Sequence, residues 1–404
     1  MTALDQPVGW FVPGRIEVLG KHTDYAGGHS LLAAVDRGIT ATVLPAAEGI
    51  TAHTAALPGE VSITAGQSND LPQGHWGNYL QTVVDRLTQN FGAVAPMQVS
   101  VDSNLPLASG MSSSSALVVG LALAIAEFNG FIESDTWRDA ISSPEDLAGY
   151  LACIENGMSF GPLAGHRGVG TFGGSEDHTA MICSAPASLG LFSFAPIRCE
   201  MVLPFPDELS FVVAVSGVAA EKTGAARELY NRAAFGVRDI LERWNQQPGV
   251  APQPSLAAAL RSGPEAIERA QGLVADDPWL SRRLAHFLAE SERIIPAAAQ
   301  AFERGDWDGF GTVVDESQQQ ASQTLGNQVP QTEFLAEQAR SLGALASCNF
   351  GAGFGGSVWA LVPAGDADGF GQAWLERYRV QFPEVAPLAS VMTTRPSGPV
   401  RPLD

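Results

Sequence analysis

The stretch that most constrains this chain is residues 13–28, PGRIEVLGKHTDYAGG. It begins with a Pro-Gly turn, continues through a short β-like run and closes on a Gly-Gly pair, without hydrophobic periodicity in its second half. Its polar side chains crowd together, and they include Arg15, Lys21, His22, Thr23 and Asp24. An ordinary strand-turn-strand unit needs no such density of donors and acceptors. A small polyhydroxylated ligand does need it, because every hydroxyl taken out of water requires a replacement partner.

Composition limits the partners of this chain. Its 404 residues are 45% hydrophobic and 16% charged, which indicates a globular protein of one large or two ordinary domains. Lys and Arg number 23 against 43 Asp and Glu, so the formal charge is −20. This excess of acid argues against nucleic acid and against an anionic membrane surface, since both favour basic proteins. No obligatory protein partner is evident. A local phosphate site remains compatible with the charge, because backbone N–H groups and Mg²⁺ supply a positive field.

Cysteine usage and the apolar segments predict a reduced, cytoplasmic setting. The cysteines show neither a CxxC pair nor the spacing of a metal finger, and they are Cys153, Cys183, Cys199 and Cys348. Residues 1–10 lack a basic segment followed by an apolar run, so no signal peptide is expected. The longest apolar stretch, residues 116–128, contains Gly120 and Glu127 and is too short for a membrane span, so it predicts a buried helix.

Hydrophobic periodicity predicts helices and strands that are mixed along the chain rather than strictly alternating. Helices are expected at residues 76–91, 113–130, 144–155 and 225–244 and through most of 250–345. Strands are expected at residues 39–44, 61–64, 97–101, 179–183, 189–194, 211–216 and 358–362. This mixture indicates an α+β fold of two lobes, with mixed sheets and packed helices. The boundary is expected near residues 190–205, which gives domains of residues 1–195 and 196–404.

Residues 106–116, PLASGMSSSSA, precede a strongly apolar helix and are typical of a phosphate-binding loop. Small residues let the backbone approach an anion, and the first turn of a helix offers free N–H groups and a favourable dipole. The candidate phosphate contacts are Gly110, Ser112, Ser113, Ser114 and Ser115. One of these hydroxyls is also a candidate magnesium ligand. An ordinary helix N-cap with a polar serine run is the structural alternative.

A second glycine-dense loop, residues 349–357 (NFGAGFGGS), lies between two strand signals. A hairpin that needs positive φ would explain one or two of these glycines. Four glycines within residues 351–356 are more than a tight turn requires, so the loop predicts close approach of the backbone to a ligand, with Gly353 as the candidate contact.

Together and in this order, the three segments resemble the motifs of the GHMP kinase superfamily. Residues 13–28 resemble the galactokinase signature PGR-hydrophobic-N-hydrophobic-IGEHTDYNGG, and the two loops resemble P-x-G-x-GLSSSAA and G-[AG]-GFGG. Weaker resemblances at residues 76–79 (WGNY) and 315–317 (DES) extend the match over nearly the whole chain. The resemblance implies a two-lobed GHMP kinase fold with its active site in the cleft between the lobes. It also implies transfer of the γ-phosphate of MgATP to the anomeric hydroxyl of galactose or a closely related sugar.

The resemblance implies catalytic and metal-binding roles for particular residues. Residues 173–178, GGSEDH, resemble the family's G-x-MDQ segment, which makes Asp177 the candidate base and Arg15 the arginine beside it. Glu155 resembles the glutamate that joins Ser114 on Mg²⁺, although extra residues within 157–170 make its distance from Asp177 in the sequence longer than in the family. A turn residue after Gly-Gly is the structural alternative for Asp177, and a surface arginine is the alternative for Arg15.

The implied sugar contacts are His22, Asp24, Gly174 and Tyr230, and Trp76 is the implied neighbour of the adenine. A core tryptophan is an equal alternative for Trp76. Two other classes of function stay open: a sugar sensor that binds ATP without catalysis, and a GHMP kinase for a heptose, fucose or mevalonate. The presence of the base, the arginine and the serine run disfavours the sensor, and the HTDY run favours the galactokinase branch.

Lys21 departs from the family, which carries a glutamate here that contacts the C6 hydroxyl of the sugar. An ammonium group only donates hydrogen bonds and reverses the local charge. Lys21 is therefore expected to contact the substrate, and a C6 carboxylate, as in galacturonate, would gain a charge-assisted bond. The alternative is that Lys21 pairs with a protein carboxylate such as Glu17.

Overall fold

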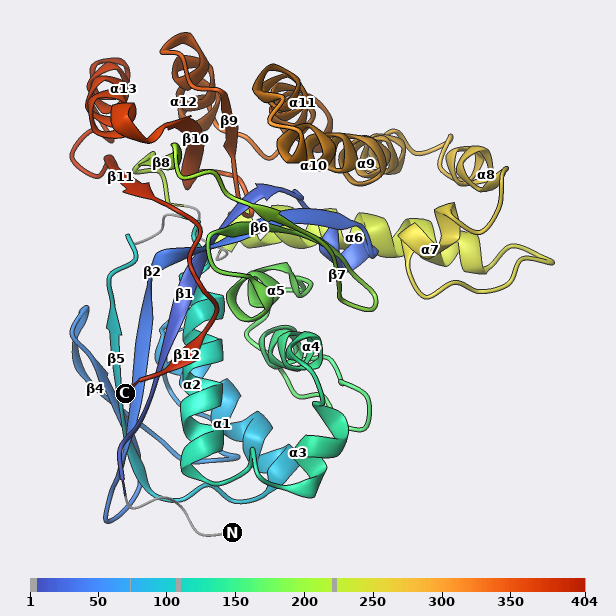
Figure 1. Ribbon diagram of the computed structural model, residues 1–404. Helices are drawn as coiled ribbons and strands as arrows, with labels where there is room; N and C mark the ends of the chain where they lie inside the picture. Colours follow the sequence, from blue (N-terminus) through green and yellow to red (C-terminus); the bar gives the residue numbers. More distant parts are fainter. Residues whose placement is uncertain (1–5, 73, 107–109, 220–223, 404) are drawn as a thin grey trace.

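The computed structural model describes residues 6–72, 74–106, 110–219 and 224–403 (Figure 1). Within these residues, eight strands form the larger of two sheets, in which β12-β1-β2-β5-β3-β4 are neighbours in that order, β6 pairs with β2, and β7 pairs with β6. Only β3 and β5 pair in parallel among the paired strands of this sheet that the structure describes. The strands are β1 (Val8–Leu19), β2 (His29–Pro45), β3 (Ile50–Thr54), β4 (Leu57–Ile63), β5 (Met97–Ser103), β6 (Ser188–Ser193), β7 (Arg198–Pro204) and β12 (Arg401–Pro402).

The helix that opens with the serine run forms the centre of the core beside the larger sheet. This helix, α2 (Ser113–Phe128), packs on β1 and β2 and against α1 (Gly77–Phe91). Gly120 allows the close approach, because a Cβ there would lie 3.1 Å from the Cβ of Ala41. Burial on nearly all sides explains why α2 is apolar around its whole circumference, and the expected buried helix is confirmed. In the described part of the chain, no helix is both long and apolar enough to cross a bilayer.

Three further helices follow α2: α3 (Asp135–Ala140), α4 (Pro144–Asn156) and α5 (Glu176–Cys183). Ser143 caps α4, since its hydroxyl accepts a hydrogen bond from the Asp146 N–H. The strand expected at residues 179–183 is wrong, because these residues form the end of α5. A short apolar run has the same pattern in a buried strand and in a buried helix, and here packing against α4 selects the helix.

The second sheet has the strand order β11-β8-β10-β9 and is covered by two helices (Figure 1). The strands are β8 (Leu209–Val215), β9 (Ala346–Asn349), β10 (Ser357–Pro363) and β11 (Ser390–Thr394), and the helices are α12 (Pro330–Ser341) and α13 (Ala367–Gln381). Trp374 of α13 is buried, and its indole N–H donates to the carbonyl of Leu335 at 3.0 Å. The glycine-dense loop joins β9 to β10, so the expected strands on both of its sides are confirmed.

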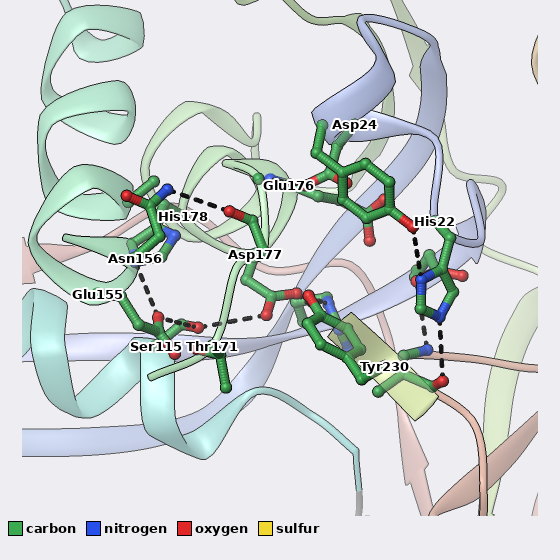
Figure 2. A pocket seen from close by; sticks show the side chains of 18 residues that line it. His22, Asp24, Ser115, Glu155, Asn156, Thr171, Glu176, Asp177, His178 and Tyr230 are labelled. Atoms are coloured by element: carbon green, nitrogen blue, oxygen red, sulfur yellow. Dashed lines mark hydrogen bonds and ion pairs between the residues drawn. The ribbon is translucent and has the colours of Figure 1, made fainter. Parts of the chain in front are cut away.

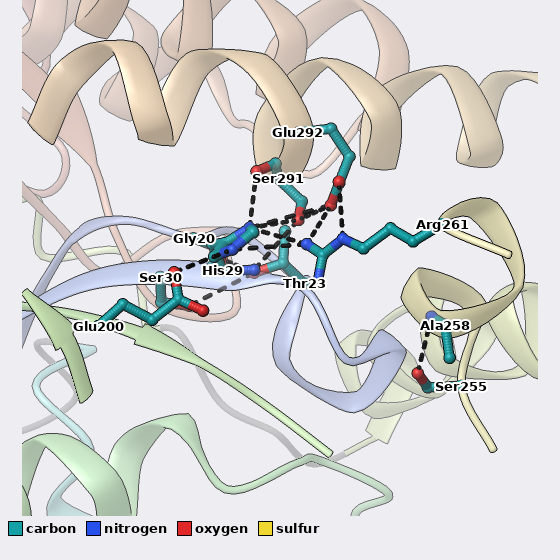
Figure 3. A network of polar contacts seen from close by, with 10 residues as sticks. All are labelled: Gly20, Thr23, His29, Ser30, Glu200, Ser255, Ala258, Arg261, Ser291 and Glu292. Atoms are coloured by element: carbon teal, nitrogen blue, oxygen red, sulfur yellow. Dashed lines mark hydrogen bonds and ion pairs between the residues drawn. The ribbon is translucent and has the colours of Figure 1, made fainter. Parts of the chain in front are cut away.

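From α6 to α12 most of the described residues are helical, as the sequence predicts. The helices are α6 (Gly224–Asn245), α7 (Leu256–Leu260), α8 (Ala266–Leu273), α9 (Pro278–Ala289), α10 (Ile295–Glu303) and α11 (Trp307–Gln320), with π-helical turns η2 (Glu290–Ile294) and η3 (Ala321–Leu325). A polar network fastens this helical part to β2 (Figure 3). Arg261 donates two hydrogen bonds to Glu292, at 2.9 and 3.1 Å. Depending on the tautomer, Nδ1 of His29 in β2 either accepts a hydrogen bond from Arg261 or donates one to the Ser291 carbonyl at 3.0 Å.

The larger sheet includes strands from both sides of the expected boundary between residues 195 and 196, and the second sheet lies wholly after it. Strand β7 lies after that boundary but extends the larger sheet, and the C-terminal strand β12 returns to pair with β1. The N-terminal lobe is therefore closed by the last residues of the chain, which the sequence pattern does not predict.

Candidate active site

The three motifs and the end of α4 meet around one cavity (Figure 2). Strand β1 supplies Arg15, the start of α2 supplies Ser115, the last turn of α4 supplies Glu155 and the first turn of α5 supplies Asp177. The free space between the lining residues is about 520 Å³, including solvent at the mouth. The opposite side is lined by His22, Asp24, Gly174, Tyr230 and Ala352.

An ion pair joins the two residues expected to carry the chemistry. The Nη2 atom of Arg15 lies 2.6 Å from Oδ1 of Asp177, and Nε donates to the same oxygen at 2.8 Å. Arg15 is buried, and its Nη1 donates to the carbonyl of Gly110 at 2.6 Å. Burial lowers the pKa of Arg15, but the charges of Asp177 and Glu17 outweigh burial and hold it above its usual value. The guanidinium therefore stays charged and ties Asp177 to the carbonyl of Gly110 in the serine-rich loop.

A serine hydroxyl bridges Asp177 to Glu155. Ser115 Oγ donates to Oε2 of Glu155 at 2.8 Å and lies 3.2 Å from Oδ2 of Asp177. His178 lies on the other side of Glu155, with Nε2 3.3 Å from Oε2. The structure thus brings Ser115 to Glu155, whereas Ser114, the serine implied by the resemblance, is half-buried one position earlier.

The extra residues between Glu155 and Asp177 fold back on themselves. The Val169 N–H donates to the carbonyl of Glu155 at 2.9 Å, and the His166 N–H donates to the carbonyl of Gly157 at 3.1 Å. The loop therefore leaves and re-enters the fold at the end of α4. Its length does not separate the two carboxylates, which both lie within hydrogen-bond distance of Ser115.

The HTDY run forms the opposite end of the cavity. His22 has a positive φ of 57°, and its ring nitrogens lie 2.8 Å from Tyr25 Oη and 3.1 Å from the Ala352 carbonyl. The Tyr230 ring lies 5.2 Å from the His22 ring. Asp24 Oδ2 accepts a hydrogen bond from the Glu176 N–H at 3.1 Å. Beside it, Gly174 has no room for a Cβ, so this contact requires glycine.

The serine-rich loop at Gly110 and the glycine-rich loop at Gly351 lie side by side at Arg15. Gly351 has a φ of 78°, and a Cβ there would lie 2.9 Å from the Gly110 carbonyl. Ser112 occupies the N-cap position of α2 with a φ of 58°, yet among the described residues its hydroxyl makes no capping bond. The ordinary serine cap, the alternative for this run, is therefore not formed at that position. Ser113 is exposed at the start of the helix.

Two expected nucleotide contacts lie outside the lining of this cavity. Gly353, with a φ of 81°, packs against Asn327, whose carbonyl also accepts a hydrogen bond from the Phe354 N–H at 2.6 Å. Trp76 is half-buried at the start of α1, where its ring stacks on His75 with centroids 6.2 Å apart. It also packs against the core of the larger sheet, in agreement with its structural alternative.

Lys21, which was expected at the sugar, does not line the cavity. Its side chain is fully buried, with Nζ 3.0 Å from both Ser317 Oγ and Cys348 Sγ. Burial lowers the pKa of this lysine, but its interactions with Cys348, Glu290 and Glu17 outweigh burial and raise it above its usual value. Lys21 therefore pairs inside the protein, as the alternative expectation has it. Its direct hydrogen-bond partners are a hydroxyl and a thiol rather than a carboxylate. The backbone turns at Gly20, with a φ of 138°, and again at His22. The side chains of Lys21 and His22 therefore point in opposite directions.

A buried acid pair beneath the cavity is absent from the sequence-based expectations. Glu17 and Glu176 both line the cavity and are hydrogen-bonded to each other. Ser30 Oγ also donates to Oε2 of Glu176 at 2.7 Å. Burial raises the pKa of Glu17 to about 7, and burial together with Glu17 and Asp24 raises that of Glu176. The available signal was a departure from the motifs, since these glutamates stand where the quoted family patterns have asparagine and methionine.

Comparison with known families agrees with this arrangement. The galactokinase galactose-binding signature matches residues 3–45, the N-terminal domain of GHMP kinases matches residues 78–162, and their C-terminal domain matches residues 298–380. The three matches include the HTDY run, the serine-rich loop with Glu155, and the second glycine-rich loop.

Proteins that are similar to this chain over most of its length also include galactokinases. The chain is 25% identical to a galactokinase of Thermotoga maritima over 92% of this chain and 93% of the relative. It is 29% identical to a galactokinase of Mycobacterium tuberculosis over 88% and 89%. A crystal structure of Lactococcus lactis galactokinase complexed with galactose has a TM-score of 0.79 at 20% identity, with coverage of 98% and 95%. A mevalonate kinase of L. major has a TM-score of 0.55 at 15% identity. The expected α+β fold and the resemblance drawn from the motifs are confirmed, and the chain belongs to the GHMP kinase superfamily as a galactokinase-type sugar kinase.

Proposed function

We propose that this chain transfers the γ-phosphoryl group of ATP to the anomeric hydroxyl of galactose or a closely related hexose. The observation that carries the proposal is the buried contact of Arg15 with Asp177, set between the serine-rich loop and the sugar-binding run. In the proposed division of the chain into residues 1–195 and 196–404, this contact belongs to the first domain. Tyr230, Gly351 and Ala352 of the second domain line the same cavity, which therefore lies in the cleft between the lobes.

Asp177 orients the attacking hydroxyl and receives its proton. An aspartate with a pKa of roughly 3.9 is a weak base, so it accepts the proton late, while the new oxygen–phosphorus bond forms and the bond from the γ-phosphorus to the bridging oxygen breaks. Arg15 favours the ionised carboxylate and adds positive charge beside the phosphoryl group in transfer. Positioning and charge neutralisation therefore supply most of the catalysis.

The oxygen atoms near Asp177 fit a magnesium ion bound with ATP. Mg²⁺ prefers one or two carboxylates, a hydroxyl and phosphate oxygens to an all-protein cage. Glu155 and Ser115 provide a carboxylate and a hydroxyl 2.8 Å apart, and Ser114 is the neighbouring hydroxyl implied by the family pattern. When bound, the ion neutralises phosphate charge. The described residues contain no group of three or more His, Cys, Asp or Glu that would hold a metal without such phosphates.

The sugar is held by groups at the opposite end of the cavity. Asp24, packed against Gly174, offers carboxylate oxygens to ring hydroxyls, and His22 and Tyr230 place an imidazole and a phenol at the same end of the cavity. The HTDY run favours galactose-type sugars over mevalonate, whose kinases lack it. A kinase for a C6-modified hexose is the second candidate, since Lys21 replaces the glutamate expected at C6 and points away from the cavity.

The test is ADP release by the purified chain with MgATP and each of galactose, galacturonate, arabinose and N-acetylgalactosamine. We expect ADP release that depends on added sugar. A chain that binds ATP and sugar without releasing ADP would be the sensor instead. ADP release at the same rate with and without every sugar would contradict the proposed sugar kinase.

A further inference from the structure

A second cavity lies behind His22, on the side away from Asp177. It is formed by α6, α9, the turn η3 and the loop after β9, and its free space is about 930 Å³, including solvent at the mouth. His22 lines both cavities, and Ala352 and Phe354 of the glycine-rich loop line one each. The two cavities are therefore separated by the residue that the proposed function assigns to the sugar.

The second cavity is basic, unlike its neighbour. Its described lining residues include Arg232 and Arg282 and no Asp or Glu. In a chain with 43 acidic and 23 basic residues, such a surface is the opposite of what composition favours. No ion pair or hydrogen bond joins either arginine to another described residue. Both guanidinium groups therefore have donors available for a ligand.

One of the two arginines is held by an aromatic ring of the same cavity. The guanidinium of Arg232 lies 4.3 Å from the centroid of the Trp279 ring, a stacked geometry that fixes the group and leaves its edge donors open. The buried Arg283 donates to the His22 carbonyl and, at 3.3 Å, to Tyr25 Oη, and so fixes the wall between the cavities. An anion is the ligand that such a site favours, because planar guanidinium groups bind carboxylates and phosphates through paired hydrogen bonds.

The order of the groups sets which end of a substrate faces this cavity. Ser115, Glu155 and Asp177 lie at one end of the first cavity and His22 at the other (Figure 2). A sugar whose reacting hydroxyl meets Asp177 therefore directs its far carbon towards His22 and the arginines beyond. Lys21, which could have met that carbon, is buried against Ser317 and Cys348.

We infer that Arg232 and Arg282 form a subsite for an anionic group, carboxylate or phosphate, on C6, the carbon of the hexose that lies away from the reacting anomeric hydroxyl. The inference rests on the proposed sugar kinase activity and names its substrate class as acidic sugars. The first cavity performs the transfer and the second one selects the substituent.

The experiment compares galactose, galacturonate and galactose 6-phosphate as substrates of the full chain with MgATP. The two acidic sugars separate a carboxylate ligand from a phosphate ligand. The variants are the double variant Arg232→Ala/Arg282→Ala and, as matched control, Arg238→Ala, an exposed arginine of α6 that stacks on Phe235 outside the cavity. Steady-state kinetics give kcat/KM for each sugar and KM for ATP, and calorimetry gives the Kd of each sugar.

We expect the wild type to prefer an acidic sugar. The double variant should lower kcat/KM and raise Kd for that sugar by about ten- to a hundredfold, the loss of a charge-assisted hydrogen bond, and leave galactose unchanged. Equal shifts for acidic and neutral sugars, a wild-type preference for galactose, or a raised KM for ATP would overturn the subsite. Failure to phosphorylate any sugar would contradict the proposed function instead, and the Kd values would still decide whether the arginines bind the anion.

Discussion

The two cavities on either side of His22 are built in opposite ways. The first is lined by Glu17, Asp24, Glu155, Glu176 and Asp177, and its charged groups are buried or half-buried and held by hydrogen bonds and an ion pair. The second carries two exposed arginines without ion-pair partners among the described residues. Groups that align a reaction must hold fixed positions, which burial and mutual hydrogen bonds provide. Groups that select a charged substituent need only the opposite charge and a side chain long enough to contact it. They can therefore project from exposed helix faces.

The largest effect is expected from the acidic cavity, in Asp177→Asn. Asparagine keeps the size of the side chain but cannot take the hydroxyl proton or pair with Arg15, so kcat should fall by about 10²- to 10⁴-fold. Sugar-dependent ADP release measures the loss. Asp102→Asn, at an exposed strand end, serves as the control. An Asp177→Asn enzyme with wild-type kcat would assign the transfer chemistry elsewhere.

The next effect concerns Lys21, which belongs to neither cavity. Lys21→Met should remove the buried cation beside Glu290 and one of the two beside Glu17, and lower the free energy of unfolding by about 3–5 kcal/mol. Lys21→Glu should destabilise further, because it buries another carboxylate beside them. Chemical denaturation measures both variants. Unchanged stability together with a raised KM for sugar would mean that Lys21 contacts the substrate after all.

A smaller effect is expected from Glu155→Gln. Removal of this carboxylate should raise the Mg²⁺ concentration needed for half-maximal activity by about ten- to a hundredfold, as expected for the loss of one hard oxygen ligand. Titration of activity with Mg²⁺ at saturating ATP measures the shift. The matched control is Glu145→Gln in the first turn of the same helix. Identical Mg²⁺ curves for Glu155→Gln and the wild type would remove Glu155 from the metal site.

The smallest effect is a pH dependence of stability from the buried acid pair. Burial raises the pKa of Glu17 to about 7, so the folded protein binds a proton that the unfolded chain releases above about pH 4.5. Stability should therefore fall as the pH rises from about 4.5 through 7, by at most about 1.4 kcal/mol per pH unit for one proton. Glu17→Gln should flatten that part of the curve of unfolding free energy against pH, and the exposed Glu60→Gln should not. A slope that is the same in Glu17→Gln and the wild type would show that the pair holds no such proton.

The sequence predicted the acidic cavity far better than its surroundings. Arg15, His22 and Asp24 were expected from the first motif, and Asp177 and Glu155 from separate resemblances at residues 173–178 and at the end of a helix. The structure brings all of them to one cavity. Motifs record residues whose positions are tied to one backbone path, such as the turn that ends in Gly27 and Gly28. They do not record in which direction a side chain points, and so the burial of Lys21 could not be predicted.

The remaining features depend on contacts between distant segments. Glu17 and Glu176 meet only because α5 packs on β1, and α5 itself was predicted as a strand at residues 179–183. The basic cavity joins helices α6 and α9 with the turn η3, and no motif links their arginines. Local sequence patterns do not predict such contacts between distant segments, because these contacts arise from tertiary packing.

The position of the phosphate in the product tests most directly whether Asp177 and Arg15 direct the transfer. Wild-type enzyme, MgATP and each sugar that supports ADP release are incubated, and the product is examined by phosphorus and proton NMR. We expect a phosphate coupled to the anomeric proton, formed by the wild type and not by Asp177→Asn. A phosphate on any other hydroxyl, or the same product at the same rate from Asp177→Asn, would contradict the claim that Asp177 and Arg15 direct the transfer.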